Sequence, residues 1–412
     1  MSIRVDPTFL PELHRYGAFD VDACFNCGNC TAICPLSTET ESFPRRMIRY
    51  AQIGLRDPLV ATRELWLCYY CGDCSDTCPR EAEPGEFMAA ARRYSIASYD
   101  LTGLSRLLYT STPFSIAFLL LLAAVFTVIL LAGPGDMARA RELGMAGTPL
   151  ASTLFEFVSA ELIHDVGITV IGIVVLAGIV SIANMAYRMF RSAAPVPGSP
   201  AEGQQPANVS QWASSLIRTI LTEVFAERRY RDCDEEKQQP WILKPWFVHG
   251  SILWGFLGLL AATALDWLLD LAGIKPTGTM VPLWYPVRLL GTVSGIFLVY
   301  GTTVAIVKRL GKADKPSSHS LLSDWVFLLL LWLAGVTGFA LEVALYLPAP
   351  QTWGYYMFIV HVVISMELVL LAPFTKFAHA FYRTAALVIH AARLGATAQA
   401  PPVPAGSSAA DA

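Results

Sequence analysis

The chain has 412 residues, enough for two or three domains, and 54% of them are hydrophobic while only 15% are charged. Its mean hydropathy of +0.47 is high for a soluble protein and indicates membrane-spanning helices, each of which needs about 20 consecutive apolar residues. The formal net charge of −3 excludes a basic nucleic-acid-binding chain, so we expect no nucleic-acid partner.

The first region, residues 1–105, is polar and rich in cysteine. No apolar run of the signal-peptide type lies between Met1 and Asp22, so we expect the N-terminus to stay in the cytoplasm. A disulfide framework is typical of small secreted domains and is therefore disfavoured. The eight cysteines of this region form two groups with the same spacing, C-x2-C-x2-C-x3-C-P. The members are Cys24, Cys27, Cys30, Cys34 and Pro35, then Cys68, Cys71, Cys74, Cys78 and Pro79.

This repeated run is typical of bacterial ferredoxins with two clusters. Three closely spaced thiolates wrap three corners of one cluster, and the fourth cysteine of each run reaches the other cluster. We therefore predict two [4Fe–4S] clusters. The first takes Cys24, Cys27, Cys30 and Cys78, and the second takes Cys68, Cys71, Cys74 and Cys34. A zinc site, the alternative, uses four ligands that often form two C-x2-C pairs, which does not explain two runs of this kind.

Six apolar runs of membrane length follow, and each predicts a transmembrane helix. They are Phe114 to Leu131, Val166 to Tyr187, Phe247 to Leu265, Leu289 to Val307, Trp325 to Leu341 and Thr352 to Thr375. Six buried helices of a large soluble core are disfavoured because the runs lack polar faces. Lysine and arginine are concentrated in the loops that lie on the same side of the membrane as the N-terminus. By the positive-inside rule, this predicts a multi-pass protein of the inner (cytoplasmic) membrane with both termini in the cytoplasm.

Between the second and third spans lies a cytoplasmic segment, residues 191–244, whose proline- and glutamine-rich start indicates a flexible linker. Trp212 to Ala226 carries apolar residues at helical spacing. This helix either lies on the membrane surface or docks on the N-terminal domain, and both interpretations stay open. The predicted divisions are a cluster domain at 1–105, two spans at 106–190, this segment at 191–244, four spans at 245–395 and a disordered tail at 396–412.

Four histidines lie at the ends of predicted spans: His164 and His361 toward the outer face, and His249 and His379 toward the inner face. Because 18 residues make five turns of about 3.6 residues, one continuous helix would place His361 and His379 on the same side, about 27 Å apart. Imidazole is a common axial ligand of haem, so we predict one or two haem b groups held by these four side chains. An ordinary interfacial histidine with a satisfied hydrogen bond is the alternative at each position.

The predicted fold class is mainly α: an N-terminal α-helical two-cluster ferredoxin-like domain followed by a six-helix transmembrane cytochrome b bundle. Glu367 is an ionisable residue inside the last span, and such residues are candidates for a functional site. We predict that it exchanges protons with a quinone substrate. A hydrogen bond from Glu367 to a neighbouring helix is the alternative.

These motifs carry a family resemblance. The Cys24 to Pro79 region resembles the small iron–sulfur subunit of heterodisulfide reductases, and the helical region with its His361 to His379 spacing resembles the haem b subunits of heterodisulfide reductase and respiratory nitrate reductase. Both parts in one chain resemble the membrane-bound C subunit of the quinone-interacting membrane-bound oxidoreductase complex. The nitrate reductase pattern places two ligand histidines on one earlier helix, whereas here that helix offers only His249.

The resemblance implies soluble flavin and iron–sulfur subunits of the same complex as partners, a membrane quinone as substrate, and adenylylsulfate reductase as electron partner in dissimilatory sulfur metabolism. We therefore predict a membrane electron-transfer subunit of a quinone-linked oxidoreductase complex. Two alternatives remain: a heterodisulfide-reductase-type subunit that serves a thiol/disulfide enzyme, and a non-catalytic membrane anchor for the cluster domain. Four histidines that pair by depth disfavour the anchor, which needs none.

Overall fold

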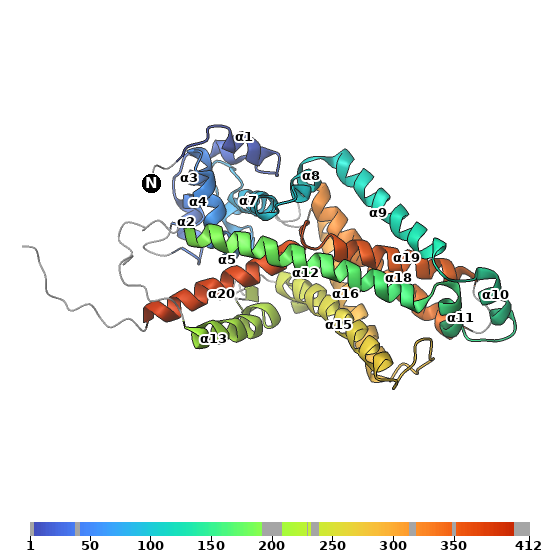
Figure 1. Cartoon of the computed structure of the whole chain (residues 1–412). Coiled ribbons are helices and arrows are strands. Elements are labelled where there is room, and N and C mark those ends of the chain that lie inside the picture. Colours follow the sequence, from blue (N-terminus) through green and yellow to red (C-terminus); the bar gives the residue numbers. More distant parts are fainter. Residues whose placement is uncertain are drawn as a thin grey trace, which may run out of the picture.

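The computed structural model describes residues 4–37, 42–191, 208–228, 230–231, 239–312, 319–347 and 352–398. Within these ranges the chain is helical and contains no β-strand (Figure 1). The start of the predicted linker, 192–207, and the predicted tail from 399 onward lie outside the described residues. The mainly α fold class is therefore confirmed for the part of the chain that can be described.

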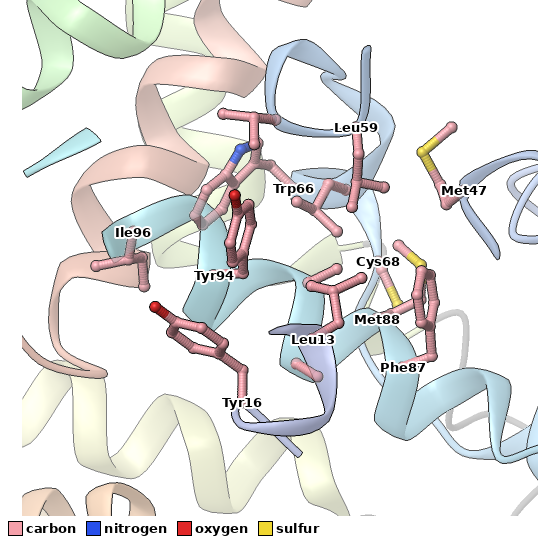
Figure 2. Packing of buried hydrophobic residues seen from close by; sticks show 14 of the residues in the cluster. Leu13, Tyr16, Met47, Leu59, Trp66, Cys68, Phe87, Met88, Tyr94 and Ile96 are labelled. Carbon is pink, nitrogen blue, oxygen red and sulfur yellow. The ribbon is translucent and has the colours of Figure 1, made fainter. Parts of the chain in front are cut away.

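The N-terminal domain consists of short helices around a buried core, as the two cysteine runs leave little room for long ones. These helices are α1 (Phe9–His14), η1 (Val21–Ala23), α2 (Asn29–Ile33), α3 (Arg45–Gln52), α4 (Arg56–Ala61), α5 (Glu64–Leu67), α6 (Asp73–Asp76), α7 (Pro84–Tyr99) and α8 (Leu104–Thr110). Leu13, Trp66 and Phe87 are among the side chains that fill the core (Figure 2).

The two cysteine runs fold in the same way. In each run a glycine with left-handed backbone, Gly28 (φ 93°) or Gly72 (φ 97°), directly precedes a short helix. That helix, α2 or α6, carries the third cysteine of its run, Cys30 or Cys74. Glycine adopts positive φ without steric cost, so the residue after the second cysteine can reverse the chain there. The helices α2 and α6 also pack against each other, which brings the two runs together.

Six further helices are long and apolar enough to cross a membrane, which supports a multi-pass membrane protein. They are α9 (Thr112–Ala132), α12 (Ala160–Arg191), α15 (Pro245–Leu271), α16 (Pro286–Leu310), α18 (Leu322–Tyr346) and α19 (Thr352–Leu370). Three of them begin with a proline in the first turn. Backbone N–H groups in the first turn have no partner within the helix, so a proline there costs no hydrogen bond. Each coincides with one of the six apolar runs of the sequence.

Close backbone contact joins α15 and α16. A Cβ atom added at Gly255 would lie 2.5 Å from the Leu298 backbone nitrogen, and one added at Gly301 would lie 2.8 Å from the Val248 carbonyl oxygen. In a membrane, apolar side chains contact lipid as favourably as they contact another helix. Small residues favour association because they let the two backbones approach closely. Next, α18 packs on α16, α19 packs on α18, and both α9 and α12 contact α19.

The six long helices have a near end, next to the N-terminal domain, and a far end, which α10 (Met137–Met145) and α11 (Leu150–Phe157) cover (Figure 1). At the far end the buried Tyr355 hydroxyl of α19 lies 2.7 Å from the Thr153 hydroxyl and donates to the Ala140 carbonyl at 3.1 Å. These contacts tie the far half of α19 to α10 and α11.

At the near end α12 and α20 (Ala378–Ala398) extend past the other long helices and pack on the N-terminal domain (Figure 1). Met185 of α12 and Tyr382 of α20 are buried in the same core as Trp66. The Tyr382 ring centroid lies 5.4 Å from that of Trp66 and 5.1 Å from that of Tyr99. The N-terminal domain and the helices that follow it therefore share one core.

The predicted amphipathic helix is present as α13 (Val209–Thr219), which continues into a π-helical turn, η2 (Ile220–Phe225), before the short η3 (Trp241–Leu243). A capping box between Asn208 and Gln211 starts it, with both hydrogen bonds at 2.8 Å. The helix packs on α20. Trp212 packs against the core around Trp66, whereas Leu216 and Ile217 are 45% and 59% exposed, so the apolar residues of α13 are only partly covered.

The expectation that one helix carries both His361 and His379 is wrong. The chain leaves the helix after Leu370, and α20 begins only at Ala378. Pro373 lies in this break, and a proline removes a backbone donor and clashes with the preceding turn of a helix. The turn is closed instead by hydrogen bonds between residues three positions apart, such as that from the Ala372 N–H to the Val369 carbonyl at 3.1 Å.

Candidate functional site

The four cysteines predicted for the second cluster line one cavity. They are Cys34, Cys68, Cys71 and Cys74. Burial raises the pKa of Cys34 to about 12, and the neighbouring thiols Cys68 and Cys71 add to the rise. Thiols that are buried this close together resist ionisation unless a cation compensates the charge of the thiolates. A bound metal is such a cation, and it deprotonates a coordinating thiol. The cavity therefore suits an iron–sulfur cluster.

The cysteines predicted for the first cluster also lie together. Burial raises the pKa of Cys30 to about 11, and the charges that add to this rise are those of Cys24, Cys27 and Cys78. Cys78 comes from the second run, so a cysteine of each run lies close enough to influence the other run. The crossed ligand sets and the ligand role of each cysteine stay predictions.

Backbone N–H groups point at two of the sulfur atoms. The amide of Tyr70 donates to the Cys68 sulfur at 3.3 Å, and that of Ala82 donates to the Cys78 sulfur at 3.4 Å. Such bonds tune the potential of a cluster. Among the described residues, no three cysteine, histidine or acidic side chains are close enough to hold one metal ion. A four-iron cluster differs because its thiolates bind separate iron atoms.

The imidazoles of His249 and His379 face each other at the near end, one from α15 and one from α20. Their ring centroids are 6.3 Å apart and their planes differ by 62°. Two imidazoles bound on opposite sides of one metal ion, with bonds of about 2.0–2.1 Å, place their centroids about 6 Å apart. The spacing of these two rings therefore fits a pair of axial haem ligands.

Both rings engage their Nδ1 atoms with an acceptor. His249 Nδ1 lies 2.6 Å from the Glu227 carboxylate, and His379 Nδ1 lies 2.6 Å from the Lys376 carbonyl oxygen. In the neutral ring Nδ1 then carries the proton and Nε2 keeps its lone pair. Histidines that bind metals are almost always held in this way. Burial, together with the nearby His249, lowers the pKa of His379 to about 3, which keeps its ring neutral as a ligand requires.

Glu227 stands in a backbone conformation that is rare for a glutamate, with φ of 47°, and its side chain is buried. A strained, buried carboxylate persists only where its surroundings fix it, and such residues are concentrated at functional sites. Its second oxygen, Oε2, has no hydrogen-bond partner among the described residues. The Tyr230 ring packs edge-on against His249 at 5.6 Å. Glu227 and Tyr230 thus both hold the His249 ring.

The two histidines of the predicted outer pair lie on different helices, His164 on α12 and His361 on α19. His361 Nδ1 lies 3.0 Å from the Thr337 hydroxyl of α18, which itself donates to the Leu333 carbonyl at 2.6 Å. This contact holds the His361 ring against α18. His164 lies half-buried on α12. In the described part of the chain no ring contact joins it to His361.

Glu367 lies on α19, is 5% exposed, and lines a cavity between α9 and α19. The sequence left open whether its carboxyl pairs with a neighbouring helix. Its Oε1 atom is buried without a hydrogen-bond partner among the described residues. Glu367 therefore places a buried carboxyl group at a cavity whose other lining residues are mostly apolar.

Comparison with known proteins identifies the cysteine region. Residues 20–82 match the family model of the 4Fe-4S dicluster domain. This region of the chain is a 4Fe–4S dicluster domain. No solved structure gives a significant match to the chain.

Two curated relatives match the dicluster domain. The C subunit of the H(2):CoB-CoM heterodisulfide,ferredoxin reductase of Methanothermobacter thermautotrophicus is 33% identical over 63 residues, which are 15% of this chain and 34% of the relative. The iron-sulfur C subunit of the CoB–CoM heterodisulfide reductase of Methanopyrus kandleri is 36% identical over 67 residues, which are 16% of this chain and 33% of the relative. The chain thus spans about a third of the length of these relatives.

A third relative extends into the long helices. Citrate utilization protein B of Escherichia coli is 25% identical over 270 residues, which are 65% of each chain. Together with the fold, these matches describe an iron–sulfur electron-transfer subunit that is similar to the C subunit of heterodisulfide reductase in its dicluster domain and that has a membrane-type helical part.

One helix connects the dicluster domain with the histidine pair. Arg383 lies one turn after His379 on α20 and donates to the Trp66 carbonyl at 3.0 Å and to the Cys68 carbonyl at 3.1 Å. Its guanidinium also lies 3.8 Å from the centre of the Tyr69 ring. The helix α20 therefore carries a candidate haem ligand, His379, on one turn. On the next turn it carries Arg383, which binds the loop of the second cluster.

A buried charge network joins the same parts. Asp324 of α18 pairs with Arg93 of α7 at 2.9 Å and with Lys376 at 2.6 Å, and Arg93 also pairs with Glu86 at 3.0 Å. Lys376 is the residue whose carbonyl holds His379. The sequence indicated none of these roles, because Asp324 looks like the polar boundary of a span and Glu227 looks like one more charge in a polar loop.

Proposed function

We propose that the chain is a membrane electron-transfer subunit of a quinone-linked oxidoreductase complex. It exchanges electrons between a membrane quinone and soluble partner proteins, with haem b held by His249 and His379 and two [4Fe–4S] clusters held by the eight cysteines. When bound, haem b and the clusters supply carriers of single electrons. The observation that carries the proposal is the His249–His379 pair, whose rings lie 6.3 Å apart beside the dicluster domain.

The chain's own residues prepare this pair. The Glu227 carboxylate and the Lys376 carbonyl set the orientation of the two rings and leave both Nε2 atoms as bases. Arg383 fixes the start of α20 to the Cys68 loop, so the spacing between the histidine pair and the second cysteine set cannot vary freely. His361 and His164 are the proposed ligands of a second haem, with His164 the weaker candidate because no ring contact joins it to His361 in the described part of the chain.

The partners and the orientation are part of the proposal. We place the chain in the inner (cytoplasmic) membrane with both termini in the cytoplasm, where the dicluster domain meets soluble flavin and iron–sulfur subunits of the same complex. Adenylylsulfate reductase is the proposed electron partner. The charge bias of the loops supports this orientation. The exposed Cys27 supports a route toward a soluble protein, because it is the one exposed cysteine of the two runs.

A second candidate function is an electron-transfer subunit that serves a thiol/disulfide enzyme. The identity of 33% and 36% with the C subunits of two heterodisulfide reductases favours it. Co-purification of the full chain with its native partners separates the two candidates. Adenylylsulfate reductase among the captured proteins supports the first function, and the catalytic subunit of a heterodisulfide reductase supports the second.

An optical spectrum of the full-length chain, purified in detergent and reduced with dithionite, tests the haem, with pyridine haemochrome giving haem b per chain. We expect haem b in the wild type and its loss in both His249→Ala and His379→Ala. His14→Ala is the control, because His14 pairs with Asp22 on the surface of the N-terminal domain. A chain with intact clusters and no haem b would overturn the cytochrome part of the proposal.

A further inference from the structure

A groove runs along the surface between α9 and α19. Its α9 wall consists of Ala123, Thr127 and Leu131, which are four residues apart and so share one face of the helix. Tyr356 and Val360 form the outer part of the α19 wall and are 61% and 44% exposed, so the groove opens sideways where the surrounding lipid would lie. Its volume is about 440 Å³, which falls within the range of small-molecule sites, about 300–1,000 Å³.

One carboxyl group closes the deep end of this groove. Glu367 is 5% exposed, lies beside the Ala123 backbone, and leaves Oε1 buried without a hydrogen-bond partner among the described residues. Leaving a buried polar atom without a partner is costly, so this carboxyl calls for a compensating role. The remaining polar groups of the wall are the hydroxyls of Thr127 and Tyr356. The groove therefore offers an apolar slot with a hydrogen-bonding group at its inner end.

We propose that this groove binds the headgroup of a membrane quinone, with the Glu367 carboxyl hydrogen-bonded to one oxygen of the ring. The inference rests on the proposed function and gives it a location. A quinone is a flat apolar ring with a carbonyl oxygen at each end, and its reduced form carries hydroxyls there. A carboxylic acid donates to the carbonyl and a carboxylate accepts from the hydroxyl, so one residue serves both forms.

The chemistry favours a quinone over an ordinary lipid. An acyl chain fills an apolar slot but brings no donor or acceptor to the Glu367 oxygen. A phospholipid headgroup is charged and strongly hydrated, and drawing it along the helices to Glu367 carries a large desolvation cost. A quinone reaches the groove from the lipid side, keeps its apolar tail at the exposed mouth near Tyr356, and places a ring oxygen at the deep end.

The test uses the full-length chain with its haem and clusters, reconstituted in phosphatidylcholine vesicles. The probe is a quinone with a photoreactive group on its ring, and the labelled peptides are mapped by mass spectrometry with and without excess unlabelled quinone. Ala123→Phe fills the groove, whereas Ala124→Phe places the same bulk on the exposed face of α9. Glu367→Leu removes the hydrogen-bonding group, and Glu367→Gln keeps a donor for the oxidised ring.

We expect saturable labelling of the α9 and α19 peptides that Ala123→Phe abolishes and Ala124→Phe leaves unchanged. Glu367→Leu should weaken binding of the oxidised probe about 3- to 10-fold, as for one lost hydrogen bond, and Glu367→Gln should stay within about twofold of wild type. The haem and cluster spectra of each variant show that it has folded.

Three other outcomes overturn the inference. Saturable labelling of a different region refutes the groove but leaves the proposed function standing. Labelling that spreads over all six long helices and is not displaced shows a lipid-filled groove only. A holo chain that takes up no probe refutes both the groove and the quinone part of the proposed function.

Discussion

Replacing Asp324 by asparagine should weaken the attachment of the dicluster domain to the long helices. Asp324 is 3% exposed on its side chain and pairs with Arg93, which is 7% exposed. Its second oxygen accepts from Lys376 at 2.6 Å. Asparagine keeps the size of the side chain and the cap on the Leu321 amide, so the change removes little besides the charge.

The magnitude follows from what the substitution leaves behind. Removing one partner of a buried ion pair costs about 3–5 kcal/mol, because the other charge stays buried without compensation. Arg93 keeps Glu86 as a partner, which places the expected cost near the lower figure of about 3 kcal/mol. With a urea dependence of about 1–3 kcal/mol per molar, this loss lowers the unfolding midpoint by roughly 1–3 M.

Pulse proteolysis of the full chain in detergent, at increasing urea, measures the folded fraction of the dicluster domain. Asp266→Asn is the matched control, since Asp266 pairs with Lys275 at 2.8 Å but is 46% exposed, and its loss should cost less than about 1 kcal/mol. Arg93→Met combined with Asp324→Asn should cost less than the sum of the single changes. Equal midpoints for Asp324→Asn and Asp266→Asn would show that this network does not hold the two parts together.

Three further substitutions address the redox sites. Glu227→Leu leaves the His249 Nδ1 proton without its acceptor and should weaken haem retention about 10- to 100-fold on washing. Glu223→Leu is the control: Glu223 lies four residues earlier, on the π-helical turn, and accepts from Tyr69, so this variant should retain haem. Arg383→Gln removes a positive charge at the Cys68 carbonyl, and this charge stabilises the reduced second cluster. If the reduced form loses about 1 kcal/mol of stabilisation, redox titration should show a potential lower by roughly 40 mV. An unchanged potential would contradict this. Cys34→Ser and Cys78→Ser should each halve the iron content but remove different clusters, and identical electron paramagnetic resonance spectra would refute the crossed ligand sets.

Much of the architecture was predictable because two signals are strong and local. The cysteine spacing of each run acts over a few residues, and the glycine after the second cysteine allows the turn that the spacing needs, as Gly28 and Gly72 show. The six apolar runs are equally direct, since a helix in lipid must be apolar along its whole length. Neither signal depends on which distant residues meet.

The remainder depended on distant contacts. The last apolar run continues across Pro373 to Thr375 in the sequence. Only the fold shows that the chain turns at this proline and places α20 on the dicluster domain. His249 and Glu227 are 22 residues apart in a segment without a pattern, so their hydrogen bond could not be read from spacing. The pairing of Asp324 with Arg93 crosses 231 residues and left no trace in either local sequence.

The shared core around Trp66 and Tyr382 has a consequence for the order in which the protein matures. A ribosome makes the dicluster domain first, but the apolar surface of that domain is completed by α20, which emerges last. The core of the dicluster domain therefore stays incomplete until all six long helices have been synthesised and inserted. A chain that stops after α19 would leave that surface bare, and quality-control proteases would meet it before any partner protein did.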